Sequence, residues 1–268
     1  MSDSVDTFSV VEFPKIRQAY VDILEQGRRK HLIHGMVEAD VTDARRALRR
    51  RADAGQPLSL TAFVVSCVAQ AVDEQPMLHA YRLGRRRLVL FDDVDVNLQV
   101  EEARPDAESI VRSRIVRGAN RKTVDEISAE IRGAQRGADV DRRRYRHTLR
   151  YLSLPRPVRM LGWRVVMGHP RWFKRFGGTV AVSAVGMFTE GGGWGIPLTP
   201  TTLMVTVGGI ATREVSVEGG GRPREQLSLT VTVDHDIVDG APAARFTRRL
   251  CELIEHATGI DDQTAARR

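Results

Sequence analysis

The chain has 268 residues, 42% of them hydrophobic and 28% charged, which is enough for one large domain or two small ones. It contains no run of 18 apolar residues, so no membrane-spanning helix is expected, and its polar, acidic start does not resemble a secretory signal. The two cysteines, Cys67 and Cys251, are too few for a disulfide framework, so we expect buried thiols and a cytoplasmic location.

The first half of the chain shows both helical and strand patterns. Apolar spacing predicts helices over 15–29, 42–52, 62–72 and 124–136, and strands over 31–41, 87–91, 94–100 and 109–116. Thr42 and Thr123 are predicted N-caps, and Glu126 stands at the capping-box position after Thr123. Either Ser59 or Thr61 is expected to open the apolar helix that follows.

A strongly basic segment occupies residues 142–176. It holds eleven Arg and Lys residues and no acidic residue, in a chain of net charge +7. Pro155 and Pro157 predict a helix, a break and a second helix. The apolar residues interleaved with these cations are Leu149, Leu152, Leu154, Met160, Leu161, Trp163, Val165, Val166, Trp172 and Phe173.

Three interpretations of the basic segment compete. Nucleic-acid binding would require a recognisable module, and the sequence contains none, so no nucleic-acid partner is expected. Mixed cations and apolar residues would suit contact with a membrane surface. The third interpretation is a site for an anionic ligand, or a solvated face whose apolar residues pack inward. We favour the solvated face over peripheral membrane contact.

Strand patterns dominate the last third of the chain. Strands are predicted over 179–185, 202–207, 214–217 and 227–233, and a final helix is predicted over 241–256. Glycines predict a mobile loop at Gly186 and 191–193, a strand break at 208–209, and a hairpin turn at 219–223. Because helices come early and strands cluster late, we expect an α+β fold rather than alternating βαβ units.

The segment 230–240 is the most informative for chemistry. A β-branched strand runs into His235, which Asp239 and Gly240 follow. An imidazole at a strand end, with a reference pKa of about 6.5, could act as a general base. We do not expect Asp239 to pair with His235, because the chain turns between them. Asp239 is expected to fix the turn or to pair with an arginine elsewhere.

A base alone does not define a reaction. Acyl transfer also needs a donor for the developing oxyanion, which is worth ~3–4 kcal/mol. Ser183, a hydroxyl within an Ala/Val strand, is a candidate for this donor. Taken separately, His235 is more often a satisfied core histidine, and Ser183 is more often an ordinary strand serine. The two residues therefore gain meaning only in combination.

The order of motifs resembles the catalytic domain of the dihydrolipoyl acyltransferases of 2-oxo acid dehydrogenase complexes, and of chloramphenicol acetyltransferase. Residues 234–240 resemble the DHRxxDG motif of that family, and residues 177–186 resemble its GGTFTISNLG motif. Residues 33–42 resemble its PHxxxxxEVDVT strand, and residues 196–200 its Pro-rich strand. The likeness extends over residues 13–257.

The resemblance implies a chloramphenicol acetyltransferase-like sandwich, in which helices pack on a mixed β-sheet, and a homotrimer. It implies a single catalytic domain over 13–258 that contains the basic insert 142–176. Residues 1–12 would form an N-terminal arm, and residues 259–268 a flexible tail.

The resemblance also implies roles for individual residues. His235 would be the general base, and Ser183 of a neighbouring subunit would donate to the oxyanion. Asp239 would hold the architecture of the site, together with an arginine from the N-terminal region. CoA or acetyl-CoA would be a substrate, without a metal or a covalently bound lipoyl group. Candidates for the CoA phosphates are Arg112, Arg114, Arg117, Arg121 and the cations of 142–176.

The sequence departs from the family pattern at several points. Ala184 stands in the place of an Asn, Asp236 in the place of an Arg or Lys, and residues 107–111 in the place of a GLVVPV strand. We expect no lipoyl domain and no Ala/Pro-rich linker before the domain. We therefore expect a free-standing CoA-dependent acyltransferase that acylates a hydroxyl of a small molecule, such as a tetronate intermediate.

Three alternatives stay open. The first is a dihydrolipoamide acyltransferase that acts in trans, and the second is a catalytically inactive trimeric scaffold. The third is a condensation lobe with an HHxxxDG motif, which we favour least because Asp234 occupies the position of its first histidine.

Overall fold

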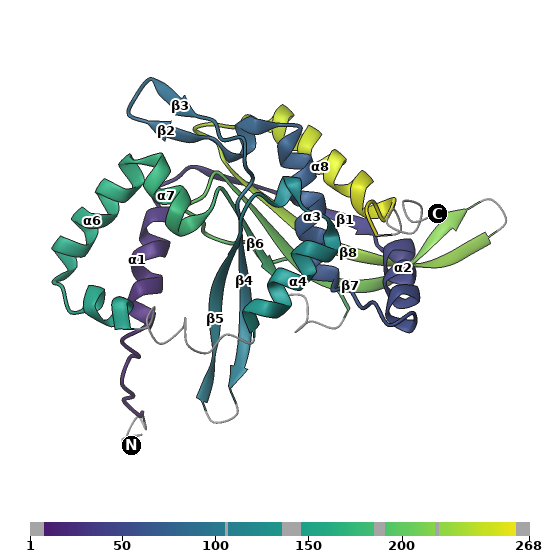
Figure 1. Cartoon of the computed structure of the whole chain (residues 1–268), viewed down its shortest axis with the longest axis horizontal. Coiled ribbons are helices and arrows are strands. Elements are labelled where there is room, and N and C mark those ends of the chain that lie inside the picture. The colour runs from purple at the N-terminus through teal and green to yellow at the C-terminus, as the bar shows by residue number, and fades with distance from the viewer. Residues whose placement is uncertain (1–7, 105–106, 136–145, 185–190, 218–219, 261–268) are drawn as a thin grey trace, which may run out of the picture.

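The structure is a computed structural model that describes residues 8–104, 107–135, 146–184, 191–217 and 220–260 (Figure 1). The features expected at 142–145, Gly186 and Gly219 lie outside the described residues. The helices are α1 (Arg17–Gly27), α2 (Thr42–Asp53), α3 (Leu60–Asp73), η1 (Pro76–His79), η2 (Ala119–Arg121), α4 (Val124–Gln135), α6 (Arg156–Gly168), α7 (Pro170–Gly177) and α8 (Gly240–Glu255), and residues 146–152 are also helical. The strands are β1 (Leu32–Asp40), β2 (Tyr81–Leu83), β3 (Arg87–Val89), β4 (Val96–Arg104), β5 (Ala107–Val116), β6 (Val180–Ala184), β7 (Leu203–Val217) and β8 (Gly220–Asp234).

A six-stranded mixed sheet organises the molecule. Its strand order is β1-β8-β7-β6-β4-β5, and β2 and β3 form a separate two-stranded ribbon. The central strands β4, β6 and β7 run parallel, whereas the pairs β1–β8, β7–β8 and β4–β5 are antiparallel. Helices α2, α3, α4 and α8 lie together beside the sheet, and α1, α6 and α7 lie at its other end (Figure 1). The expected α+β class is confirmed.

The two faces of β8 differ in character. Val231 and Val233 are buried in the hydrophobic core and face the hollow beneath α8. Thr230 and Thr232 alternate with these valines and therefore belong to the other face of the strand. This second face of the sheet is polar, and it is the face that carries Ser183.

The helix starts follow the predicted capping chemistry in two of three cases. The Ser59 hydroxyl accepts a hydrogen bond from the Ala62 N–H at 3.0 Å and caps α3. Thr123 and Glu126 form the predicted capping box at the start of α4. The expectation for Thr42 was wrong, because Thr42 lies inside α2 and its hydroxyl accepts the N–H of Glu225 instead.

The glycine pair in β7 does not end the strand, contrary to expectation. Strand β7 continues through Gly208 and Gly209, where its pairing with β8 shifts register. A Cβ at Gly208 would collide with the carbonyl oxygen of Gly193, and the Gly209 N–H donates to that same oxygen at 3.2 Å. The glycines therefore let a loop lie directly on the sheet. Strand β8 also begins at Gly220, so most of the turn expected at 219–223 is strand.

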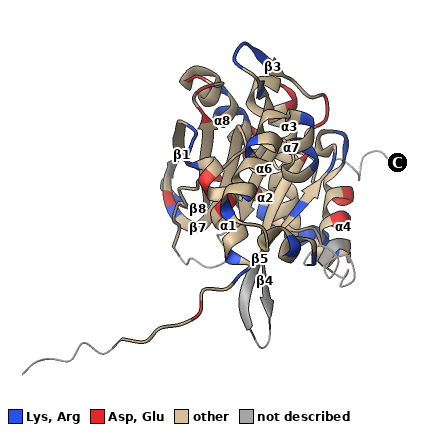
Figure 2. Ribbon diagram, turned by 90° about the vertical axis from the view of Figure 1, so that its left-hand side faces the viewer, with Lys and Arg blue, Asp and Glu red and all other residues tan. Residues whose placement is uncertain are grey.

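The basic segment folds as helices attached to the side of the domain. Figure 2 views the molecule from this side, on which α1, α6 and α7 lie. Arg159 of α6 donates to the carboxylate of Asp22 in α1 at 2.7 Å, and the Tyr151 hydroxyl donates to the same carboxylate at 2.8 Å. The Phe173 ring packs edge-on against Tyr81 with ring centroids 5.1 Å apart. The segment is therefore held at both ends.

Two further expectations concern the cysteines and the C-terminus. Cys67 is a buried free thiol, and Cys251 is a partly buried one. The packed chain extends to Ile260, which is fully buried and whose carbonyl oxygen accepts a hydrogen bond from Arg51 at 2.9 Å. Within the described residues, no helix is long and apolar enough to cross a membrane.

Candidate active site

His235 follows β8 directly and stands at a tight turn before α8. Its backbone N–H donates to the carbonyl oxygen of His31 at 2.8 Å, so the register of β1 and β8 holds this position. The carbonyl oxygen of Asp234 accepts the N–H groups of Ile237 and Val238, both at 3.0 Å, and closes the turn. The imidazole is 45% exposed. A half-exposed ring on a fixed backbone is suited to proton transfer with a bound substrate.

Asp239 lies closer to His235 than we expected. Its carboxylate Oδ1 is 3.7 Å from His235 Nδ1, which is within ion-pair range but too long for a hydrogen bond. Asp239 is also the residue before α8, and its side chain caps no backbone N–H. Among the described residues it has no arginine partner. The local pairing that seemed excluded is therefore the observed one, because the turn after β8 brings position i+4 back towards the ring.

A charged network beside His235 was missed in the sequence. Asp236 accepts from His31 Nδ1 at 2.8 Å and from an Arg82 guanidinium nitrogen at 3.1 Å. The hydrogen bond to Asp236 raises the pKa of His31, and the same bond lowers the pKa of Asp236. Lys30 also pairs with the buried carboxylate of Asp234 at 2.5 Å. The sequence offered one indication of this network, the acidic residue at position 236, but its cationic partners come from other segments of the chain.

Ser183 lies near the end of β6, on the polar face of the sheet. It is partly buried, and its hydroxyl makes no hydrogen bond with the described residues. The strand register places Ser183 opposite Thr206 and places Thr206 opposite Thr230. The hydroxyls of both threonines are buried and have no hydrogen-bond partner among the residues that the structure describes. A row of three hydroxyls without described partners therefore crosses β6, β7 and β8.

Ser183 and His235 do not meet within one chain. Thr230 aligns with Ser183 across β7, and His235 lies five residues further along β8 than Thr230. At the usual rise per strand residue this offset is about 17 Å, before the spacing of two strands is added. Any site that contains both side chains must therefore take them from different copies of the chain.

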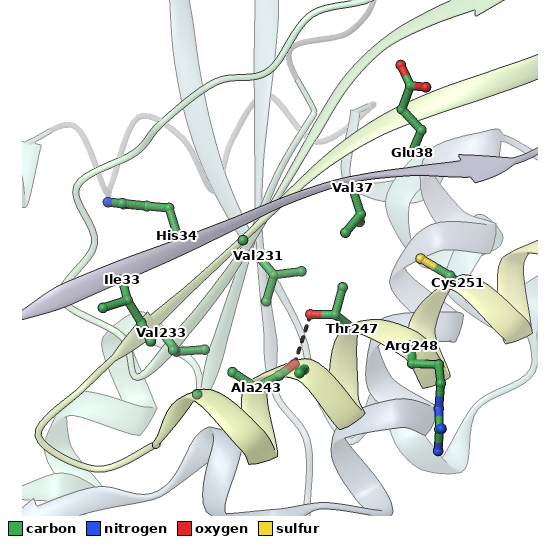
Figure 3. A pocket seen from close by; sticks show the side chains of 13 residues that line it. Ile33, His34, Val37, Glu38, Val231, Val233, Ala243, Thr247, Arg248 and Cys251 are labelled. Atoms are coloured by element: carbon green, nitrogen blue, oxygen red, sulfur yellow. Dashed lines mark hydrogen bonds between the residues drawn. The ribbon is translucent and has the colours of Figure 1, made fainter. Parts of the chain in front are cut away.

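A hollow of about 520 Å³ lies elsewhere, between the edge strand β1 and helix α8 (Figure 3). Ile33, Val37 and Val233 point towards α8 and line it with apolar surface, whereas His34 and Glu38 project from the other side of β1. None of the three predicted site residues lines this hollow. It is consequently separate from the candidate active site.

Several predicted phosphate ligands are already engaged in the fold. Arg117 pairs with Asp95 at 2.7 Å, and Arg121 pairs with Asp93 at 2.8 Å. The side chain of Arg112 lies outside the described residues. No group of three or more His, Cys, Asp or Glu side chains in the described part of the chain could hold a metal ion.

Solved structures identify the class of the fold as an acyltransferase core. A probable dihydrolipoamide acetyltransferase from Listeria monocytogenes superposes with a TM-score of 0.69 at 20% identity, over 93% of this chain and 95% of that one. The catalytic core of a 2-oxoacid dehydrogenase complex from Thermoplasma acidophilum gives a TM-score of 0.67 at 23% identity, over 94% and 100% of the two chains. A chloramphenicol acetyltransferase gives 0.50 at 16% identity, over 92% and 99%.

The chain belongs to the family of the 2-oxoacid dehydrogenases acyltransferase catalytic domain, whose model matches residues 6–144 and 174–260. It is 25% identical to a lipoamide acyltransferase component of the branched-chain alpha-keto acid dehydrogenase complex of Bacillus subtilis, over 86% of this chain and 47% of that protein. It is 26% identical to a dihydrolipoyllysine-residue acetyltransferase component of Mycoplasma genitalium, over 74% and 44%. The chain spans about half the length of these relatives. The resemblance drawn from the motifs is thus confirmed.

Proposed function

We propose that the protein transfers an acetyl or short acyl group from acyl-CoA to a hydroxyl of a small molecule, at a site formed between two copies of the chain. His235 removes the proton of the acceptor hydroxyl, and the oxygen attacks the thioester carbonyl. Ser183 of the other copy donates a hydrogen bond to the tetrahedral oxyanion. When the intermediate collapses, the C–S bond breaks and the protonated His235 returns the proton to the CoA sulfur.

The position of Asp239 supports the role of His235 as a base. Its carboxylate, 3.7 Å from His235 Nδ1, would stabilise the imidazolium that forms once the proton is taken. The exposed ring leaves the remaining nitrogen open to a substrate. The neighbouring charges of Lys30, His31 and Arg82 are paired with Asp234 and Asp236, which leaves His235 as the titratable ring that faces solvent without a closer partner.

The proposal that two copies share the site rests on the separation of Ser183 and His235 within one chain. Ser183 has an uncommitted hydroxyl among the described residues, His235 has an uncommitted imidazole edge, and the strand register keeps them apart in one chain. A solved dihydrolipoamide acetyltransferase from Azotobacter vinelandii is described by the roles of a serine, a histidine and an asparagine in its catalytic mechanism. Its serine and histidine have the same separation along the chain as Ser183 and His235, and its asparagine has the spacing of Asp239.

The acceptor distinguishes this proposal from a second one. The curated relatives are named for lipoamide and dihydrolipoyllysine, which supports a dihydrolipoamide acyltransferase as the alternative. The departures at Ala184 and Asp236 change the side chains next to both catalytic candidates, so the acceptor of the relatives does not transfer directly to this chain. A secondary-metabolite alcohol such as a tetronate is the acceptor class that we propose first.

The test is the release of CoA thiol from acetyl-CoA, measured against a panel of alcohols and against free dihydrolipoamide. We expect turnover with an alcohol and a fall of about 10²–10⁴-fold in kcat for His235→Ala, the usual contribution of a general base. His256→Ala is the matched control, because His256 is exposed and bonds only to the carbonyl of Glu252 in its own helix.

Each outcome distinguishes between the proposed functions. Unchanged turnover in His235→Ala would remove the mechanism. Faster transfer to dihydrolipoamide than to every alcohol would replace the hydroxyl acceptor with the lipoyl alternative. Absence of turnover with all acceptors would favour a scaffold.

A further inference from the structure

The helices of the basic segment expose a row of large apolar side chains. On α6 these follow helical spacing at Val158, Leu161 and Val165, and on α7 they lie four residues apart at Trp172 and Phe176. Together with Leu154 they are between 42% and 64% exposed. The interpretation that the apolar residues of this segment all pack inward was therefore wrong, although Phe173 is buried. We call the surface formed by these six residues the insert face.

Arginines are interspersed with these apolar residues. Arg156, Arg164, Arg171 and Arg175 are all exposed, and none makes a side-chain ion pair with the described residues. The segment 142–176 holds no acidic residue that could neutralise them. By contrast, most surface arginines of α2 pair with nearby carboxylates, as Arg45 does with Glu225 and Arg46 with Asp43. The two helices that form the insert face therefore expose both apolar side chains and arginines without an ion-pair partner among the described residues.

Most of the insert face lies outside the part of the chain that the family model matches. The family model matches residues up to 144 and from 174 onwards, so α6 and the first half of α7 have no counterpart in it. The segment is nevertheless fixed in place, because Asp22 and Arg159 form a buried ion pair between α1 and α6. An apolar surface that faces solvent in the single chain, and that lies mostly outside the family match, indicates a binding partner.

Charge decides which partner fits. A second copy of this surface would bring like charges together, which disfavours self-association through it. A nucleic acid would use the arginines but would gain nothing from burying valine and leucine, and Trp172 is already stacked on His169 with ring centroids 4.6 Å apart. An anionic lipid surface uses both features, because phosphates attract the arginines while apolar and aromatic side chains enter the boundary between headgroups and acyl chains.

We propose that the insert face binds the surface of a membrane containing anionic lipids, with α6 lying along it. The catalytic fold would then sit at the bilayer. Helix α7 contacts β2, and Arg82 of β2 bonds to Asp236 beside His235, so the insert and the candidate active site share a structural connection.

The test is co-sedimentation of the full chain with vesicles. One set contains phosphatidylcholine alone, and the other contains two parts phosphatidylcholine to one part phosphatidylglycerol. We expect binding to the anionic vesicles that weakens in high salt, because exposed charges are screened within a few ångström there. The variant Leu161→Glu/Val165→Glu should lower the partition coefficient about tenfold or more, since it removes apolar contact and adds negative charge.

The matched control is Val215→Glu, another exposed apolar residue, which lies on the β7–β8 hairpin away from the insert. It should bind vesicles as the unchanged chain does. Absence of binding to the anionic vesicles overturns the proposal, and so does equal binding by the double variant, which would assign the binding to net charge alone. A change in solution mass in the double variant would also overturn it, because the insert face would then be a contact between copies. Acyl transfer is not read out, so the result is independent of the proposed reaction.

Discussion

At the scale of single residues, the hydroxyl of Ser183 makes no hydrogen bond within the described part of the chain. The Ser183→Ala change removes one hydrogen-bond donor without altering the strand, so we expect folding to be unaffected and kcat to fall by about 10²–10³-fold, as for other oxyanion donors. Acetyl-CoA turnover at saturating acceptor measures this effect. Ser153→Ala is the control, because Ser153 is exposed and its hydroxyl bonds only to the nearby carbonyl oxygen of Arg150. A Ser183→Ala enzyme as active as the control would dismiss the serine from the reaction.

His79 is a buried histidine whose role is structural. Its Nδ1 lies 3.2 Å from the Thr179 hydroxyl, and burial, followed by the positive charge of Lys174, lowers its pKa to about 4 from 6.5. The unfolded chain therefore binds a proton between pH 6.5 and 4 that the folded chain does not bind. Above pH 6.5 the effect of His79 on the free energy of unfolding does not change with pH. As the pH falls from 6.5 to 4, the free energy of unfolding decreases by about 3 kcal/mol in total.

Urea unfolding at several pH values measures this dependence. In His79→Gln the fall between pH 6.5 and 4 should be smaller than in the unchanged chain by about that amount. The exposed His256→Gln variant should keep the original slope. If the free energy of unfolding depended on pH in the same way in all three proteins, His79 would titrate normally in the folded chain.

At the scale of secondary-structure elements, a buried ion pair joins α6 to α1. Asp22 is 2% exposed and Arg159 is 7% exposed, so removing one partner leaves a buried charge. We expect Arg159→Met to lower the free energy of unfolding by about 3–5 kcal/mol. Arg164→Met, on an exposed position of the same helix, should stay within about 0.5 kcal/mol.

A second variant separates charge from packing. Asp22→Leu/Arg159→Met replaces both partners with apolar groups and should be more stable than Arg159→Met alone, because no unpaired charge remains. Thermal or urea unfolding compares the three proteins. If Arg159→Met were as stable as Arg164→Met, the ion pair would not hold the insert.

Local sequence patterns predicted most elements but not their long-range features. The Ser59 cap and the Thr123–Glu126 capping box depend on neighbouring residues only, and both were predictable. Thr42 has the right chemistry for a cap, but its hydroxyl is taken by a residue of a distant strand. Gly208 looks like a strand breaker in sequence. Its reason for being glycine is the close approach of Gly193, which only the folded chain reveals.

The candidate site also combines features that depend on neighbouring residues with features that depend on the folded chain. The spacing of His235 and Asp239 after a strand is a local pattern, and it was enough to single out both residues as candidates. The network around Asp236 depends on the pairing of β1 with β8, which brings His31 beside it, and on Arg82 from a different ribbon. Neither pairing can be predicted from spacing. Ser183 has only a weak local signal, a hydroxyl within an Ala/Val strand, and the resemblance to the family added the role of oxyanion donor.

At the scale of the whole molecule, the account requires that copies of the chain come together. Residues that belong to one reaction lie about 17 Å apart along the strand direction within the single chain. Ser183 is only partly buried on the polar face of the sheet, and under the proposed mechanism a second copy would present its histidine to this residue. Under the proposed mechanism, each site takes its serine from one copy and its histidine from another.

Mixing two inactive variants tests this claim most directly. Neither His235→Ala nor Ser183→Ala alone has an intact site, but a mixed assembly holds sites that take His235 from one chain and Ser183 from the other. If the two proteins are unfolded together and refolded in equal amounts, acetyl-CoA turnover should return to about one quarter of the unchanged enzyme, the share of such sites in a random cyclic assembly. Turnover that stays at the level of the separate variants would contradict a site shared between copies.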